Sequence, residues 1–159
     1  MPAMTRYVHT NVVARDWRKL AGFYTLVFGC KRVPPGRNLA GDWLDGLTSL
    51  KNAHIRGMHL RLPGHGAAGP TLEIFEYSPK SAAGRPCINR PGFAHIAFSV
   101  PDVKQALRAV LRNGGSSVGS RVEAAIEGVG RIDVVYVRDP EGNIIELQKW
   151  RRRVPRREH

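Results

Sequence analysis

Two stretches of the chain repeat one order of apolar and polar positions. Each begins with an alternating apolar run, which is typical of a strand, over residues 7–13 and 93–100. Apolar residues at helical spacing then follow, over residues 17–28 and 103–111. The repeat predicts a strand and then a helix at the start of each half of the chain.

Two histidines and two aspartates keep the same spacing in both stretches. His9 precedes Asp16 by seven positions and His95 precedes Asp102 by seven, so one offset of 86 residues superimposes both pairs. Asp16 and Asp102 stand where a helix N-cap belongs, because a short carboxylate side chain can accept hydrogen bonds from the first free amides of a helix. We therefore expect each histidine on a strand and each aspartate at the start of a helix.

Strand-like patterns fill the remainder of each half. Residues 139–143, DPEGN, give a strong turn signal before the last strand. The sequence therefore predicts an α+β fold of two βαβββ modules, residues 6–77 and 93–150, joined by a Pro- and Gly-rich linker over residues 78–92. The strands expected after the two helices are residues 43–50, 55–62 and 71–77 in the first module and residues 121–127, 131–138 and 144–150 in the second.

A glutamate lies between apolar neighbours in the last predicted strand of each module. Glu73 and Glu146 would cost free energy if they were buried without a partner. Each is matched by a histidine on the first strand, His9 or His95, and two imidazoles with two carboxylates suit a divalent first-row metal ion. The pattern by itself leaves a second interpretation open, in which the glutamates lie on a solvent-exposed edge and the histidines are structural.

Asn11, Phe75 and Gln148 share the strand faces of His9, Glu73 and Glu146, because side chains alternate along a strand. On a different strand, the one predicted at 55–62, His59 and Arg61 share a face. They could bind an acidic group, and the alternative is that they are simply exposed strand residues. The candidate substrate-binding residues on these faces are Asn11, His59, Arg61, Phe75 and Gln148.

Composition narrows the class of protein. The chain has 159 residues, of which 42% are hydrophobic, and this suits one compact domain or two small modules with a shared core. No apolar run approaches the ~20 residues needed to cross a bilayer, and the N-terminus lacks the apolar core of a secretory signal. We expect a cytoplasmic protein with no membrane partner. Cys30 and Cys87 form neither a disulfide framework nor a C-x-x-C pair, so we expect reduced thiols.

The formal net charge of +12 raises the question of a nucleic-acid partner. Five arginines lie in the last ten residues, WRRRVPRREH, and we expect the tail over residues 151–159 to be solvated and disordered. A contact with nucleic acid or an acidic surface is the alternative, which the absence of a nucleic-acid-binding motif disfavours. The remaining positive charge would suit an anionic small-molecule substrate.

Four motifs resemble the vicinal oxygen chelate superfamily, which includes glyoxalase I, methylmalonyl-CoA epimerase, extradiol dioxygenases, and the fosfomycin and bleomycin resistance proteins. They are HTNVVARDWRKLAGFYTLVFGC, LEIFEY, GFAHIAFSVPD and VYVRDPEGNIIEL, and the resemblance covers residues 6–150. The last motif is the most specific, because the final strand of the superfamily follows a D-P-x-G-N turn and carries a metal-binding glutamate, here Glu146. The other ligand positions correspond to His9, Glu73 and His95.

The resemblance implies a single glyoxalase-like domain over residues 1–159, in which the modules form an open, U-shaped mixed-sheet cleft around a divalent ion of Ni, Co, Zn, Mn or Fe. It also implies a homodimer. The His-Glu-His-Glu set resembles that of bacterial glyoxalase I and is close to that of the epimerases. Both abstract a proton next to a carbonyl, which makes Glu73 and Glu146 the candidate catalytic residues.

The first module departs from glyoxalase I after its opening motif. The stretch GDWLDGLTSLKNAHIRGMHLRLPGHG has no match to a glutathione-binding segment, so an epimerase or another lyase with a different substrate is equally open. Two further alternatives are an iron-dependent ring-cleaving dioxygenase and a drug-binding resistance protein without catalysis. The four filled ligand positions count against the resistance protein, which typically lacks the full set.

Overall fold

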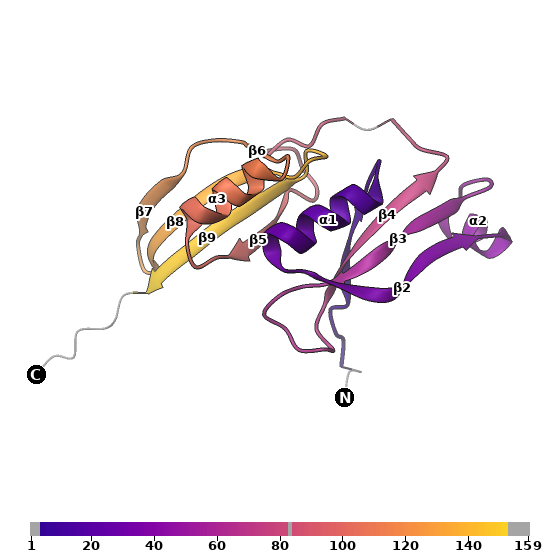
Figure 1. Cartoon of the computed structure of the whole chain (residues 1–159), viewed down its shortest axis with the longest axis horizontal. Helices are drawn as coiled ribbons and strands as arrows, with labels where there is room; N and C mark the ends of the chain where they lie inside the picture. Colours follow the sequence, from indigo (N-terminus) through magenta and orange to yellow (C-terminus); the bar gives the residue numbers. More distant parts are fainter. Residues whose placement is uncertain (1–3, 83, 153–159) are drawn as a thin grey trace, which may run out of the picture. The chain divides into compact units, whose positions relative to one another are not determined.

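A parallel pair formed by the first and last strands organises each half of the chain in the computed structural model (Figure 1). The structure describes residues 4–82 and 84–152. The chain divides into two units, Met1–Ala83 and Gly84–His159, and each contains its own open sheet with one longer helix. The predicted α+β class is confirmed, with two sheets and few helices.

The sheet of unit 1 has the strand order β1-β4-β3-β2. Strand β1 runs parallel to β4, whereas β2, β3 and β4 are antiparallel neighbours. In chain order the elements are β1 (His9–Val13), α1 (Trp17–Phe28), β2 (Lys31–Ala40), α2 (Asp42–Thr48), β3 (His54–Arg61) and β4 (Thr71–Ser78).

The predicted strand over residues 43–50 is wrong, because this segment forms helix α2. Its apolar residues Trp43, Leu44 and Leu47 follow helical spacing, and only Leu44 is buried. The first strand after α1 is instead β2, which precedes this segment and contains Pro34 and Pro35. β2 lies at the edge of the sheet and changes register with a bulge between Val33 and Arg37, and both features allow prolines in a strand.

Helix α1 begins and ends as its sequence predicts. The carboxylate of Asp16 accepts hydrogen bonds from the amides of Arg18 and Lys19, each at 3.1 Å. Gly29 ends the helix in the left-handed conformation, with φ of 69°. The buried face of α1 packs on β3 and β4, so one face of the sheet is covered and the other remains available for a site. The buried residues of this layer are Trp17, Leu20, Ala21, Phe23, Tyr24, Leu60, Leu72 and Ile74.

The sheet of unit 2 repeats this plan, with the order β5-β9-β8-β6 and β7 paired to β8. Asp102 caps α3 as predicted and accepts a hydrogen bond from the amide of Gln105 at 2.9 Å. The elements are β5 (His95–Ser99), α3 (Val103–Arg112), β6 (Ser116–Ser117), β7 (Val122–Ile126), β8 (Gly130–Arg138) and β9 (Ile144–Arg152).

The predicted turn between β8 and β9 is built around Asp139. This side chain is 3% exposed, and its carboxylate accepts hydrogen bonds from the amides of Glu141 and Asn143 and from the side chain of Asn143. The turn fixes the register in which Arg138 faces Ile144 and Tyr136 faces Glu146. The strand predicted to end at residue 150 continues to residue 152, and residues 153–159 of the predicted tail lie outside the described residues.

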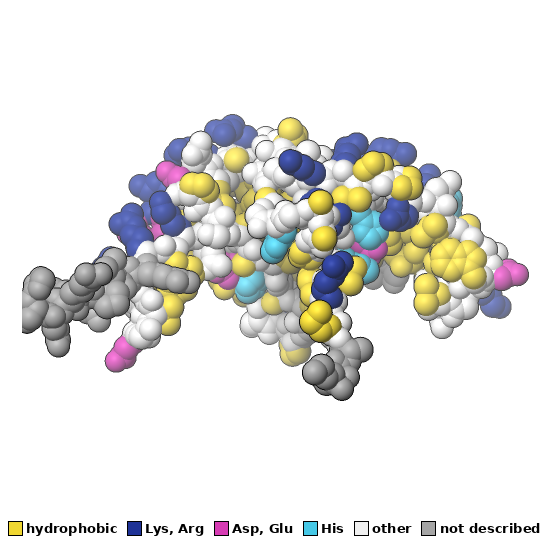
Figure 2. All heavy atoms as spheres, turned by 90° about the horizontal axis from the view of Figure 1, so that it is seen from below, with side chains coloured by type: hydrophobic (Ala, Val, Ile, Leu, Met, Phe, Trp, Pro, Cys, Tyr) yellow, Lys and Arg dark blue, Asp and Glu magenta, His cyan; other side chains and the backbone are white. Residues whose placement is uncertain are grey.

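Lysine and arginine side chains are spread over the face shown in Figure 2, with few acidic side chains among them. In the part of the chain that the structure describes, no helix combines the length and hydropathy that a membrane span needs.

Candidate functional site

Each predicted histidine and its glutamate meet across the parallel strand pair of their own unit. In unit 1, β1 and β4 pair so that Asn11 faces Glu73. In unit 2, β5 and β9 pair in the same register, so that Ala97 faces Glu146. Because each histidine lies two residues before the residue that faces the glutamate, it is the diagonal neighbour of that glutamate on the same face of the sheet.

The carboxylate of Glu73 has three polar partners. His9 Nε2 lies 3.1 Å from Oε2, and Asn11 Nδ2 donates to the same oxygen at 3.3 Å. His59 Nε2 lies 2.8 Å from the other oxygen, Oε1. The side chain of Glu73 is only 12% exposed, so these contacts offset the cost of burying its charge. Asn11 was predicted on the strand face of His9, and His59 was predicted on the strand at 55–62; in the structure both contact Glu73.

Burial favours the neutral form of His59, whose Nε2 faces the carboxylate of Glu73. Its pKa is lowered from 6.5 mainly by burial and also by the charges of Arg37, His9 and Arg61, while Glu73 acts in the opposite direction. An ionised carboxylate can only accept, so the proton lies on Nε2. Nδ1 is then the acceptor of the hydroxyl proton of Thr71, at 3.0 Å. This pair of contacts fixes the orientation of the His59 ring.

Phe75 packs against the ring of His59. Its side chain is 8% exposed and belongs to an apolar cluster with Leu44 of α2, Ala53 and Ile55. Its ring centroid lies 5.9 Å from that of His59 in an edge-to-face contact. Gly57 faces Phe75 across the strands, and a Cβ atom there would lie only 2.6 Å from the phenyl ring. Phe75 therefore supports the His59 ring from the side of α2.

Unit 2 holds the matching pair. His95 Nε2 lies 3.0 Å from Glu146 Oε2, and the side chain of Glu146 is 14% exposed. Tyr136 faces Glu146 from β8, and its ring centroid lies 5.1 Å from that of His95. Burial and then the charge of Glu146 and a hydrogen bond to it raise the pKa of Tyr136 above 10.0, so its hydroxyl remains a donor to that carboxylate at neutral pH.

Tyr136 was not among the predicted site residues. A signal for it exists in the sequence, because the turn at residues 139–143 fixes which residue of the hairpin faces Glu146. Tyr136 corresponds to His59 of unit 1, which faces Glu73 in the same way. Gln148, a predicted substrate-binding residue, lies two positions after Glu146, and its side-chain oxygen accepts a hydrogen bond from Trp150 Nε1 at 2.6 Å.

The spacing of donor atoms in both pairs fits a shared cation. Two ligands that bind one ion at about 2.1 Å in adjacent octahedral positions stand about 3.0 Å apart. The two nitrogen-to-oxygen distances, 3.1 and 3.0 Å, are compatible with this value and equally with a direct hydrogen bond between histidine and glutamate. Within residues 4–82 or within residues 84–152, however, no group of three or more His, Cys, Asp or Glu side chains could hold a metal ion. Each unit therefore offers a pair of ligands and not a complete site.

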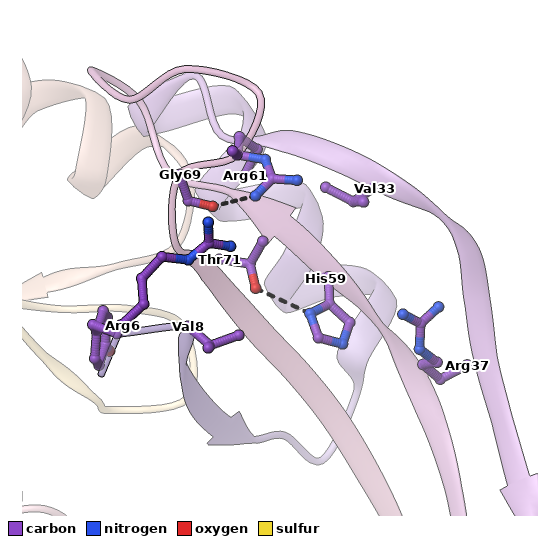
Figure 3. Close-up of a pocket in the computed structure, with 10 residues that line it drawn as sticks. Arg6, Val8, Val33, Arg37, His59, Arg61, Gly69 and Thr71 are labelled. Carbon is purple, nitrogen blue, oxygen red and sulfur yellow. Dashed lines mark hydrogen bonds between the residues drawn. The ribbon is translucent and has the colours of Figure 1, made fainter. Parts of the chain in front are cut away.

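Unit 1 also contains a cavity of about 250 Å³ next to His59. Figure 3 shows Arg6, Arg61 and Arg37 around Thr71 and the ring of His59. Arg61 and His59 were predicted together as candidates for binding an acidic group, and both line this cavity. Arg6 and Arg37 were not predicted, because the residues before β1 and the bulge of β2 carry no pattern that places them here.

A family model for the Glyoxalase/Bleomycin resistance protein/Dioxygenase superfamily matches residues 6–147. Comparison with curated protein sequences gives no significant match.

Several solved structures share the fold. A glyoxalase family protein from Bacillus cereus is 19% identical with a TM-score of 0.79, and the match covers 93% of this chain and 95% of that one. A glyoxylase/bleomycin resistance protein/dioxygenase domain from Frankia sp. EAN1pec is 20% identical with a TM-score of 0.61, covering 94% and 100%. A fosfomycin resistance protein from Listeria monocytogenes is 14% identical with a TM-score of 0.52, covering 95% and 94%. At these identities the likeness concerns the fold alone.

Proposed function

Because this chain belongs to the glyoxalase/bleomycin resistance protein/dioxygenase superfamily, we propose that it is a metal-dependent lyase or isomerase. His9, Glu73, His95 and Glu146 are the proposed ligands of one divalent ion of Ni, Co, Zn, Mn or Fe. Glu73 or Glu146 moves a proton next to a carbonyl group of a small-molecule substrate. The protein acts as a homodimer.

One observation carries this proposal, namely the same histidine–glutamate pair at the same strand register in both units. A single pair could be a structural ion pair. Two equivalent pairs, each on the sheet face that is not covered by the long helix, are what a ligand set divided between two modules requires. The nitrogen and carboxylate donors are also those that suit a divalent first-row ion.

When bound, the ion supplies Lewis-acid polarisation of a carbonyl oxygen, which makes the neighbouring C–H group more acidic. The chain orients the groups that move the proton. His59 holds Oε1 of Glu73, so that Oε2 is the oxygen beside His9. Tyr136 donates to Glu146 and keeps that carboxylate beside His95. With Oε1 held by His59, Oε2 of Glu73 would serve as a ligand or as a general base but not as both at once, so the glutamate that moves the proton would be the one displaced from the ion.

Metal analysis tests the ligand set. After purification without chelator, or after titration with Ni²⁺, Co²⁺ or Zn²⁺, elemental analysis is expected to give one ion per proposed set of four ligands. Glu146→Gln and His9→Ala should weaken binding by at least about tenfold, because the first replaces a charged ligand with a neutral amide and the second removes a ligand. His54→Ala is the matched control, since this histidine contacts Asn38 at 2.5 Å instead of a glutamate. Protein that takes up none of these ions would contradict the proposed site.

Isotope exchange tests the type of reaction. The metal-loaded protein is incubated in D₂O with methylglyoxal and glutathione, with acyl-CoA thioesters, and with catechols under oxygen monitoring. We expect deuterium to enter the carbon next to a carbonyl without oxygen uptake. Oxygen uptake with catechol cleavage would identify a dioxygenase instead, and binding without any exchange or turnover would identify a non-catalytic binding protein.

A further inference from the structure

The cavity beside His59 gathers three guanidinium groups from separate parts of unit 1. Arg6 precedes β1, Arg37 lies just after the bulge of β2, and Arg61 ends β3. The β2–β3 pairing explains the convergence, because Val33 faces His59 and Arg37 faces Gly57, two residues away. The bulge between Val33 and Arg37 thus brings Arg37 to the side of the cavity formed by His59.

Among the described residues, these three arginines form no salt bridges. Of the described residues that line the cavity, none is an aspartate or glutamate. Arg37 donates to the carbonyl of Pro35 at 2.5 Å, and Arg61 donates to the carbonyl of Gly69. Each of these bonds uses only one of the five N–H donors of a guanidinium. The cavity therefore has positive charge that no carboxylate of the described residues neutralises, and N–H donors that remain available to a ligand.

We propose that this cavity binds a doubly charged tetrahedral oxyanion, the phosphoryl or phosphonyl group of a small substrate. Three guanidiniums match the three peripheral oxygens and the charge of about −1.5 to −2 of such a group. A carboxylate has one charge and two oxygens, so it would satisfy one guanidinium in the bidentate mode and leave the other two poorly neutralised. The Thr71 hydroxyl donates to His59, and its oxygen can also accept from an arginine of the cavity.

The oxyanion cavity adjoins the proposed catalytic group through His59, which lines the cavity and contacts Glu73 at 2.8 Å. The role of the anion as one end of the substrate rests on the proposed function. A substrate anchored here would place its next carbons on the side of His59 and Glu73. Binding of the anion itself needs no metal, because all of its proposed ligands are arginines.

Titration calorimetry on the full chain tests this site, with EDTA present, at pH 8 and at low salt. The probes are inorganic phosphate, phenylphosphonate and acetate. We expect phosphate and phenylphosphonate to bind at least about tenfold more tightly than acetate, because charge-assisted hydrogen bonds from more than one arginine are lost with the monoanion. Binding of both tetrahedral anions supports a group carried on a substrate, and binding of phosphate alone supports a site for the free anion.

Variants distinguish phosphate binding in the cavity from nonspecific attraction of phosphate to the positively charged protein. Arg6→Gln and Arg37→Gln should each weaken phosphate binding by about tenfold. Arg112→Gln, an exposed residue of α3, makes the same charge change and should leave it unaltered. Arg61→Gln has a further effect on folding, because Arg61 also holds the carbonyl of Gly69, so the other two variants decide the test.

The inference is overturned if acetate binds as well as phosphate, if Arg112→Gln has the same effect as Arg37→Gln, or if neither tetrahedral anion binds. If the anion does not bind, the conclusion from the metal titration still stands, because EDTA keeps the ion out of the calorimetry experiment. Conversely, phosphate binding without any metal uptake would retain the anion site and refute the proposed metal-dependent reaction.

Discussion

Glu73 and Glu146 occupy equivalent positions in their units, yet their second partners differ in chemistry. Glu73 accepts from the neutral ring of His59, and Glu146 accepts from the hydroxyl of Tyr136. Groups that contact a metal ligand from outside commonly change metal affinity by 10- to 100-fold. The two glutamates are thus equivalent as proposed ligands, but a histidine ring holds one carboxylate and a tyrosine hydroxyl holds the other.

Removing the Tyr136 hydroxyl should weaken metal binding. Tyr136→Phe deletes the donor to Glu146 and retains the ring beside His95, so we expect the Kd for Ni²⁺ or Co²⁺ to rise by about tenfold with little change in fold. Calorimetry measures the Kd, and circular dichroism checks the fold. Tyr77→Phe is the control, because Tyr77 packs against the apolar cluster of Leu44. An equal Kd in Tyr136→Phe and the wild type would remove this hydroxyl from the site.

The two cysteines should differ sharply in reactivity. Cys30 is 1% exposed, and burial raises its pKa to about 11, whereas Cys87 is exposed. The thiolate is the reactive form, so raising the pKa keeps Cys30 protonated at pH 8. A colorimetric thiol reagent at pH 8 should therefore modify one thiol per folded chain quickly and the second only after unfolding in guanidinium. Rapid loss of both thiols from the folded protein would contradict the burial of Cys30.

At the scale of elements, helix α2 supports the site by packing Leu44 against Phe75 and Ile55. Leu44 is 1% exposed, whereas Leu47 on the same helix is 74% exposed. We expect Leu44→Ala to lower the free energy of unfolding by about 2–5 kcal/mol, because it leaves a cavity in this cluster. Leu47→Ala should change it by less than about 0.5 kcal/mol. Urea denaturation of both variants measures the difference, and equal losses would mean that α2 does not pack as described.

Those elements that carry an uninterrupted pattern can be predicted from the sequence. The strands of His9, Glu73, His95 and Glu146 have regular alternation, and the capped helices have clear start signals. Segment 31–50 could not be predicted, because tertiary pairing decides it. Strand β2 can contain its prolines only because it lies at the edge of the sheet and has a bulge. Helix α2 has seven residues and an internal glycine, so it forms only because Leu44 is buried against the sheet.

The candidate site divides in the same way. Alternation along a strand is enough to place each histidine on the face of its neighbours, and the structure brings His9 to Glu73 and His95 to Glu146. The contributions of Tyr136, Arg6 and Arg37 depend on which strands pair and in which register. Periodicity along one strand does not contain this information for Arg6 and Arg37, whereas the position of Tyr136 could have been obtained by counting back from the turn at residues 139–143.

At the scale of the whole molecule, metal removal should lower thermal stability. An ion that binds only the folded chain adds about 2.7 kcal/mol when it is present at 100 times its Kd. We expect EDTA to reduce the Tm of the metal-loaded wild type by several degrees. The same treatment should hardly change the Tm of Glu73→Ala, which lacks a proposed ligand. Scanning calorimetry compares the two, and an EDTA effect of equal size in both would indicate that the ion binds elsewhere.

Both histidines of the proposed ligand set stand on edge strands. Within the described residues of its unit, each of β1 and β5 ends its sheet and is hydrogen-bonded to one neighbouring strand, β4 or β9. Edge strands with few neighbours open at a lower free-energy cost than central strands. When such a strand opens, its histidine leaves the glutamate, so release of the proposed ion and fraying of the edge would become one event. Amide hydrogen exchange in β1 and β5, rather than global unfolding, would then report how fast the proposed ion is released.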